Sequence, residues 1–275
     1  MERENRKSRS LLFVPAKSEN WLLKGLASNA DHVIFDLEDS IALTDKERAR
    51  SMLVDFLSAS LLEAGRVYVR INDCASESFE EDLRALSQLE HVNIMLPKAN
   101  APTDIENVQK LLGSHNRKAI IPIIETAQGL WNAKEIALAE GVDQIAFGSV
   151  DYCLDLAIDP SSSGIELLHA RSQLVLASRV ANILPPIDGV FTSYQDANGF
   201  KREAEESKRL GFQGKLLIHP NQVELAHGVF SPSEDELLEA EEIIAAFRKA
   251  EEEGIASISV QGKMLIIQWR CVRNG

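Results

Sequence analysis

The chain has 275 residues, of which 45% are hydrophobic and 26% charged, so it is long enough to bury a large core as an ordinary globular protein. Its 42 acidic and 29 basic side chains give a net charge of −13. This balance argues against a general nucleic-acid binder, which needs a surplus of Lys and Arg, and against docking on anionic lipid.

No segment indicates a membrane span or a secretory signal. The apolar run 11–14 stops at Pro15 and is therefore too short for a signal peptide. No apolar run approaches the roughly 20 residues of a membrane-spanning helix. The three cysteines, Cys74, Cys153 and Cys271, are widely spaced and form no CxxC pair, so they indicate neither a disulfide framework nor a zinc site. We therefore expect a cytoplasmic protein.

Along the chain, short β-branched runs alternate with segments in which apolar residues recur at helical spacing. The predicted strands are 11–15, 32–36, 67–71, 92–97, 119–124, 144–147, 187–191 and 215–218. The predicted helices are 18–28, 45–60, 79–89, 103–112, 130–139, 165–183 and 197–210. This arithmetic predicts an α/β fold, a (β/α)8 TIM barrel. The alternative, an open doubly wound sheet, lacks support because the chain has no G-x-G motif and no P-loop.

The composition changes after the last predicted strand. Residues 231–254 carry nine acidic and two basic side chains, and therefore account for seven of the 13 net negative charges. We predict an amphipathic helix that is capped near Ser233 and packs on the barrel. Its apolar face would contain Leu237, Leu238, Ile244 and Phe247. The predicted domains are thus a barrel over 1–230 and a C-terminal helical extension over 231–275.

Polar residues follow most of the predicted strands. They are Asp36, Glu38, Asp39, Arg70, Asn72, Lys98, Glu125, Thr126, Asp151 and His219. The active site of a TIM barrel lies at the carboxyl ends of its strands, so these side chains should converge there. A purely structural barrel does not need such a gathering of carboxylates and cations. The pattern therefore predicts a catalytic site.

Glu125 and Asp151 follow neighbouring predicted strands and could together bind Mg²⁺, which typically takes one or two carboxylates and keeps water ligands. The alternative is that each carboxylate caps a helix. Arg70 ends an otherwise apolar strand and could hold a substrate carboxylate with its two-pronged guanidinium. The alternative for Arg70 is an internal ion pair with Glu38 or Asp39.

Lys98 has the same two interpretations as Arg70, whereas His219 is better explained as a structural histidine. The acidic run DLEDS, which contains Asp36, Glu38 and Asp39, could supply bases, water-mediated metal contacts or hydrogen-bond anchors. Position alone does not choose among these roles.

Seven segments, in order from residue 9 to residue 223, resemble the signatures of one family. They are RSLLFVPAKSENWLLK, DHVIFDLEDSIALTDKERAR, VRIN, MLPKA, IIPIIETAQGL, IAFGSVDY and GKLLIHPNQV. They look like those of the citrate lyase beta-subunit-like proteins, the superfamily of the malyl-CoA and citramalyl-CoA lyases. The resemblance implies a TIM barrel, commonly trimeric, that cleaves 3-hydroxyacyl-CoA thioesters with Mg²⁺.

By motif, the resemblance implies that Glu125 and Asp151 bind the metal and that Arg70 holds the carboxylate of the 2-oxo acid. It also implies that Glu38 and Asp39 line the region between metal and substrate, as part of the catalytic set.

The resemblance further offers cations for an acyl-CoA substrate. Arg9 and Lys17, near the first strand, are the candidates for the CoA phosphates, and Lys98 is a further candidate for substrate binding. The implied partners are an acyl-CoA and further copies of the chain in a homotrimer, with no nucleic acid and no membrane.

The family pattern is lost near the C-terminus. The family reads G-K-M-I-D-x-P there, and its Asp is thought to be the acid–base group, whereas this chain reads GKMLIIQWRCVRNG. Ile266 stands at the position of the Asp, and no acidic residue follows Lys263. Residues such as Trp269 and Cys271 suit no helix face. Our hypothesis is that this tail is a truncated or frame-shifted form of the family's ending.

The favoured function is a Mg²⁺-dependent lyase that cleaves (S)-citramalyl-CoA to pyruvate and acetyl-CoA. Alternatives within the family are a citryl-CoA or malyl-CoA lyase and a thioesterase. An alternative of another class is an inactive family member that acts as a binding or assembly subunit, because the C-terminal Asp is missing.

Overall fold

The computed structural model describes residues 7–60, 62–63, 65–113, 118–161, 163–252, 257–260 and 263–266. The chain divides into two compact units with a boundary after Phe230. Ser8–Phe230 forms one unit, and the segment from Ser231 belongs to the other.

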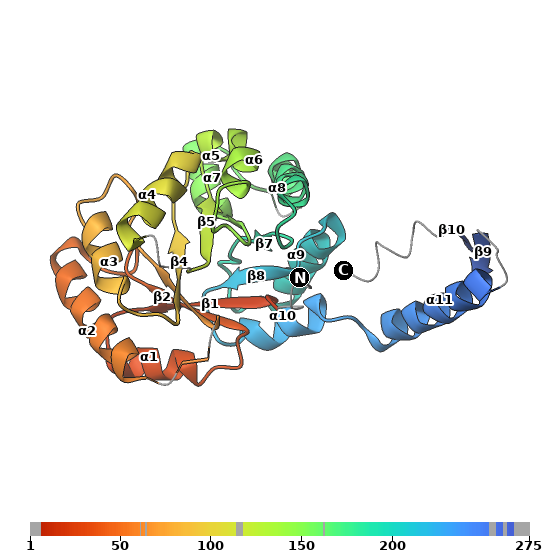
Figure 1. Cartoon of the computed structure of the whole chain (residues 1–275), viewed down its shortest axis with the longest axis horizontal. Helices are drawn as coiled ribbons and strands as arrows, with labels where there is room; N and C mark the ends of the chain where they lie inside the picture. Colours follow the sequence, from red (N-terminus) through yellow and green to blue (C-terminus); the bar gives the residue numbers. More distant parts are fainter. Residues whose placement is uncertain are drawn as a thin grey trace. The chain divides into compact units, whose positions relative to one another are not determined.

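The first unit is a closed barrel of eight parallel strands in the order β1 to β8, surrounded by helices (Figure 1). The strands are β1 (Ser10–Pro15), β2 (His32–Asp36), β3 (Val67–Arg70), β4 (Val92–Leu96), β5 (Ile120–Ile124), β6 (Ala146–Phe147), β7 (Ile187–Asp188) and β8 (Gly214–Leu217). Pairing of Leu11 with Leu216 closes the barrel between β1 and β8. The predicted (β/α)8 TIM barrel is therefore confirmed.

Helices follow the strands around the outside of the barrel. They are α1 (Glu19–Leu26), α2 (Lys46–Ala59), α3 (Phe79–Leu86), α4 (Pro102–Leu112), α5 (Ala127–Trp131), α6 (Ala133–Ala137), α7 (Ser149–Asp155), α8 (Leu168–Ala181), α9 (Ala197–Leu210) and α10 (Gln222–Phe230). The single helix expected over 130–139 is two short helices, α5 and α6, and the sequence analysis missed α7 and α10. In the described part of the chain, no helix is long and apolar enough to cross a bilayer.

Two apolar layers stabilise the barrel, because each strand turns alternate side chains inward and outward. The inward set, which fills the barrel, includes Leu11, Ile34, Tyr68, Met95, Ile121 and Leu216. The outward set, such as Val33 and Phe35 of β2, packs under the helices. All eight strands run in parallel, so their carboxyl ends meet at one end of the barrel.

A buried ion network joins the last two strands to the outer helices. Asp188 of β7 lies with its Oδ2 2.7 Å from Lys215 Nζ of β8 and its Oδ1 2.9 Å from Arg171 Nε of α8. Asp188 and Lys215 are fully buried. Burial alone would raise the pKa of Asp188, but the two cations hold it below its usual range.

The second unit contains α11 (Glu234–Glu252) and an antiparallel pair, β9 (Ser257–Val260) and β10 (Lys263–Ile266). The predicted cap at Ser233 is present, since Ser233 Oγ accepts from the amide of Glu236 and the Glu236 carboxylate accepts from the amide of Ser233. The predicted apolar face is partly wrong. Leu237 and Leu238 are 50% and 59% exposed and Ile244 is half-buried, whereas Phe247 is buried as predicted, together with Ile243 and Ala250. Trp269 and Cys271 lie outside the described residues.

Candidate active site

A small cavity lies at the carboxyl end of the barrel strands. Its volume is about 70 Å³, and its lining residues are Phe13, Arg70, Ile123, Glu125, Phe147, Gly148, Ser149, Val150, Asp151, Val190 and Leu216. These residues come from six strands or from the loops and helix that follow them. The cavity thus combines an apolar lining with one cation, two carboxylates and one hydroxyl.

Arg70, the last residue of β3, is held rigidly by Asp36, the last residue of β2. Asp36 Oδ1 accepts from Arg70 Nε and Oδ2 accepts from Nη2, both at 2.7 Å. The guanidinium also lies 4.8 Å from the centre of the Phe13 ring. Burial alone would raise the pKa of Asp36, but Arg70 keeps it below its usual range. The bidentate pair therefore fixes the orientation of the guanidinium.

Glu38 and Asp39, on the loop after β2, lie against the other edge of the same guanidinium. Nη1 of Arg70 is 2.9 Å from Glu38 Oε2 and 3.2 Å from Asp39 Oδ2. The Asp39 side chain is 61% exposed, whereas that of Glu38 is only 6% exposed. The internal ion pairs of the alternative interpretation are thus present, and Asp39 is the most accessible partner of Arg70.

The loop that carries Glu38 is anchored by a buried lysine that sequence reasoning did not single out. Lys46, at the start of α2, donates through Nζ to the carbonyls of Leu37 at 2.8 Å and of Glu38 at 2.6 Å. Burial raises the pKa of Glu38 despite its cationic neighbours Arg70 and Lys98. Glu38 Oε2 is buried and accepts no hydrogen bond from a described residue, although it forms an ion pair with Arg70 Nη1 at 2.9 Å.

Lys98, after β4, connects two carboxylates from different strands. Its amide donates to Glu125 Oε1 at 2.7 Å, and its Nζ donates to Glu38 Oε1 at 2.8 Å. Its backbone has a φ of 49°, in the left-handed region that costs a residue with a side chain about 1 kcal/mol or more. Burial alone would lower the pKa of Lys98, but the hydrogen bond to Glu38 raises it.

Glu125, which directly follows β5, is 3% exposed. Burial, together with the negative charges of Asp151 and Glu38, raises its pKa to about 8. A Cβ atom at position 148 would lie 2.2 Å from Glu125 Oε2, so glycine at this position makes room for the carboxylate. Asp151 lines the same cavity from the first turn of α7.

The helix-capping alternative for these two carboxylates is not what the structure shows. Thr126 is the N-cap of α5, where its Oγ1 accepts from the amide of Gly129, and Gly148 is the N-cap of α7. Glu125 and Asp151 are therefore left to face the cavity.

These carboxylates fit Mg²⁺. Glu125 is buried beside other negative groups, which disfavours its charged form and raises its pKa. A cation bound next to Glu125 would offset this effect and stabilise the charged form. Among the described residues, no cluster of three or more His, Cys, Asp or Glu side chains is grouped for a metal. Two carboxylates with room for water and substrate oxygens are the ligand set that Mg²⁺ accepts.

The structure separates the predicted cations. Arg9 precedes β1 and therefore lies at the amino end of the barrel, where its Nη2 is 2.7 Å from Asp31 Oδ1. That end is opposite to the cavity, so Arg9 does not come together with Arg70, Glu125 and Asp151. Lys17 follows β1 at the cavity end and is exposed. His219 stacks on Tyr194 with ring centres 4.8 Å apart.

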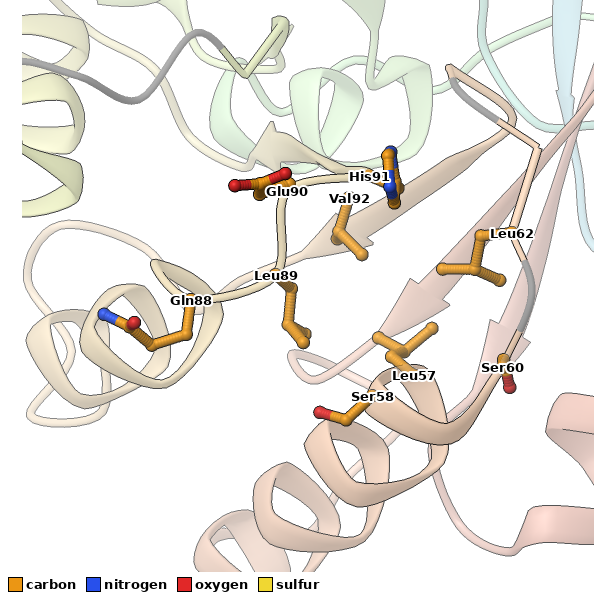
Figure 2. A pocket seen from close by; sticks show the side chains of 9 residues that line it. All are labelled: Leu57, Ser58, Ser60, Leu62, Gln88, Leu89, Glu90, His91 and Val92. Atoms are coloured by element: carbon orange, nitrogen blue, oxygen red, sulfur yellow. The ribbon is translucent and has the colours of Figure 1, made fainter.

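A larger hollow of about 290 Å³ lies beside the start of β4, near the ends of α2 and α3 (Figure 2). Leu57, Leu62, Leu89 and Val92 form much of its lining. This hollow is at the amino end of the barrel. Its described lining residues do not combine Lys or Arg side chains with carboxylates. The smaller cavity at the carboxyl end is the better candidate for an active site.

Comparison of the sequence with known proteins gives consistent matches. A model of the family HpcH/HpaI aldolase/citrate lyase matches residues 9–220. The citrate lyase subunit beta of Escherichia coli K12 is 34% identical over 273 residues, covering 96% of this chain and 90% of that protein. A (3S)-malyl-CoA thioesterase of Cereibacter sphaeroides is 34% identical over 257 residues, covering 94% of this chain and 89% of that protein.

Solved structures match as well. The CitE protein of Mycobacterium tuberculosis in complex with magnesium, acetoacetate and coenzyme A has a TM-score of 0.81 and 28% identity, and covers 95% of this chain and 94% of that chain. The citrate lyase beta subunit of M. tuberculosis in complex with oxaloacetate and magnesium has a TM-score of 0.73 and 29% identity, covering 82% of this chain and 98% of that chain.

Proposed function

Because the chain belongs to the HpcH/HpaI aldolase/citrate lyase family, we propose that it is a Mg²⁺-dependent carbon–carbon lyase whose substrate is (S)-citramalyl-CoA and whose products are pyruvate and acetyl-CoA. The observation that carries this proposal is the small cavity in which Arg70 shares an apolar lining with Glu125 and Asp151. A short 2-oxo acid has one carboxylate, one keto oxygen and one small substituent. The carboxylate matches Arg70, the keto oxygen matches a metal ion held by Glu125 and Asp151, and the substituent matches the apolar lining.

In this proposal Glu125 and Asp151 hold Mg²⁺. When bound, the ion supplies Lewis-acid polarisation of the substrate oxygens. Arg70 binds the carboxylate of the oxo-acid portion, and Asp36 keeps the guanidinium oriented for that contact. The incoming carboxylate replaces Asp39, the most exposed partner of Arg70.

Cleavage of the carbon–carbon bond requires the substrate hydroxyl to lose its proton. The electron pair of the broken bond then goes to the enolate of acetyl-CoA, which takes up one proton to give acetyl-CoA. We assign the hydroxyl proton to Oε2 of Glu38, which is buried and lies 2.9 Å from Arg70 Nη1. Its raised pKa brings this carboxylate closer to neutral pH, where a general base works best.

The cavity lining favours a methyl substituent over a second carboxylate. Phe13, Phe147, Val190 and Leu216 are apolar, and among the lining residues Arg70 is the one cation. Pyruvate therefore fits better than oxaloacetate, whose second carboxylate would be buried without a partner.

The same proposal includes an acyl-CoA bound from the cavity end, a homotrimer and a cytoplasmic location. Lys17 is the exposed cation at that end and is our candidate for the CoA phosphates. Lys98 is already paired with Glu38, so we assign it to the positioning of that carboxylate rather than to CoA.

Two other functions have specific support. A thioesterase that uses the same residues is favoured by the 34% identity to the malyl-CoA thioesterase. An inactive binding subunit is favoured by Ile266, which stands at the position of the family's Asp and lies in β10.

The test is to incubate the protein with Mg²⁺ and with citramalyl-CoA, malyl-CoA or citryl-CoA, and to assay the 2-oxo acid and free CoA separately. We expect pyruvate from citramalyl-CoA without free CoA, and slower turnover of citryl-CoA. Free CoA without pyruvate would identify a thioesterase. Binding of Mg²⁺ and pyruvate without turnover would identify the inactive subunit.

Two variants control for contaminating activity. Glu125→Gln should abolish turnover, because it removes a proposed metal ligand. Glu205→Gln changes an exposed carboxylate that is paired with Arg209 on α9, so turnover should remain that of the wild type. Equal activity of both variants would refute the site.

A further inference from the structure

Ser149 is a polar side chain of the cavity to which the proposed mechanism gives no role. It is 8% exposed and lines the cavity together with Arg70, Glu125 and Asp151. In the described part of the chain, no residue forms a hydrogen bond with its hydroxyl, and its Oγ is not among the buried polar atoms without a partner. The hydroxyl is therefore open to the cavity, where it can donate to an oxygen of a bound ligand.

The backbone opposite Ser149 makes room for this hydroxyl. Gly189 directly follows β7, and a Cβ atom there would lie 2.2 Å from Ser149 Oγ and 2.9 Å from Ser149 Cβ. No other residue type fits at position 189 without moving Ser149. Gly148 makes room for the Glu125 carboxylate in the same way. The hydroxyl is thus accommodated by the fold in the same manner as the proposed metal ligand.

The surroundings of the hydroxyl determine the kind of ligand that can satisfy it. The neighbouring lining residues Phe147, Val150 and Val190 have no polar side-chain atoms. Of the remaining polar groups, Arg70 fits an anionic ligand, and Glu125 and Asp151 fit a metal ion. The ligand groups within the cavity are then oxygens, to which a hydroxyl donates.

We propose that Ser149 determines specificity by donating a hydrogen bond to an oxygen of a small 2-oxo acid held in this cavity. This inference rests on the proposed function for the identity of the ligand. The hydrogen bond from Ser149 would be a second contact with the ligand, independent of Arg70. An apolar residue at position 149 could not form it.

The test compares Ser149→Ala with wild type in two measurements. Calorimetric titration with pyruvate at saturating Mg²⁺ should show binding weakened about 3- to 30-fold, the loss of one hydrogen bond to a neutral or charged oxygen. Thermal unfolding without ligand should show an unchanged midpoint, because the hydroxyl forms no hydrogen bond within the described part of the protein. The affinity for Mg²⁺ alone should stay within twofold of wild type.

Ser178 provides a matched control. Its Oγ on α8 is buried without a partner among the described residues, and it does not line the cavity. Ser178→Ala should leave the pyruvate affinity unchanged and should not lower the unfolding midpoint.

Three outcomes would overturn the proposal. They are wild-type pyruvate affinity in Ser149→Ala, a parallel fall of the unfolding midpoint and affinity in that variant, and no pyruvate binding by the wild type. Because the readout is binding, a protein that binds pyruvate and cleaves no thioester would refute the lyase and leave this inference standing.

Discussion

Raising the pH from 6 to 9 should tighten the binding of Mg²⁺ by about two orders of magnitude. The reason lies in Glu125, whose pKa is raised to about 8 by burial and by its negative neighbours. A carboxyl group must lose its proton before it can bind a metal ion, so proton release and Mg²⁺ binding are coupled.

The size of the effect follows from the ionised fraction of Glu125. With a pKa of about 8, this fraction is about 1% at pH 6, about 9% at pH 7 and about 91% at pH 9. The apparent affinity should therefore rise roughly 90-fold from pH 6 to pH 9, and most of this rise should occur below pH 8. Calorimetry in two buffers of different ionisation enthalpy should detect about 0.9 proton released per Mg²⁺ at pH 7 and about 0.1 at pH 9.

The metal-free protein should show the opposite dependence in its stability. Between its ordinary pKa and the raised value, Glu125 binds more protons in the folded than in the unfolded state, so stability falls as pH rises through this window. Above pH 8 the full cost is about 5 kcal/mol, which Glu125→Gln should recover in urea denaturation. The same variant should lose the pH-dependent Mg²⁺ affinity.

A Mg²⁺ affinity that stays flat between pH 6 and 9 would refute the assignment of Glu125 as a buried metal ligand. So would a Glu125→Gln variant that binds Mg²⁺ like wild type or gains no stability at pH 9.

Two further perturbations address other parts of the structure. Asp39→Asn should tighten pyruvate binding about two- to fivefold in calorimetric titration, because the exposed ion pair that it removes from Arg70 is worth at most about 1 kcal/mol. Weaker binding would show that Asp39 assists the ligand instead of competing with it. Lys215→Met should lower the free energy of unfolding by about 3 to 5 kcal/mol in urea, because it leaves buried Asp188 with Arg171 alone at close range. A loss below about 1 kcal/mol would show that the network has little net effect.

The strands that are paired along their whole length were the easiest to predict. The range 32–36 of β2 was correct to the residue, because its apolar run coincides with its register against β1 and β3. The predicted strand 187–191 was too long, since β7 ends at Asp188. Its apolar pattern continues for another reason, as Val190 lines the cavity instead of pairing in the sheet.

The missed helices depend on tertiary contacts that periodicity does not report. Only Gly148 separates α7 from β6, and no helix was predicted between the strand 144–147 and residue 165. The helix α10 begins at Gln222, whose side-chain oxygen accepts from the amides of Ile218 and His219. This local anchor has no signature in the spacing of apolar residues.

The position of a side chain at the cavity was predictable where it ends a strand or directly follows one, as for Arg70 and Glu125. The direction of a strand also decides which end of the barrel a flanking residue occupies, so Arg9, which precedes its strand, could have been assigned to the amino end on this ground. The hydroxyl of Ser149 could not have been found in this way, because the space for it depends on Gly189, which is distant in the sequence.

The two hydrogen bonds of Lys98 affect how mutagenesis at this position is interpreted. The amide holds Glu125 and the ammonium holds Glu38, and substitution of the side chain removes only the second of these contacts. Lys98→Ala removes the ammonium and keeps the cost that any residue with a Cβ atom has in the left-handed region, whereas Lys98→Gly removes the ammonium and also relieves that cost. The difference between these two variants therefore isolates the backbone's contribution, and Lys98→Ala is the appropriate baseline for comparing substitutions at this site.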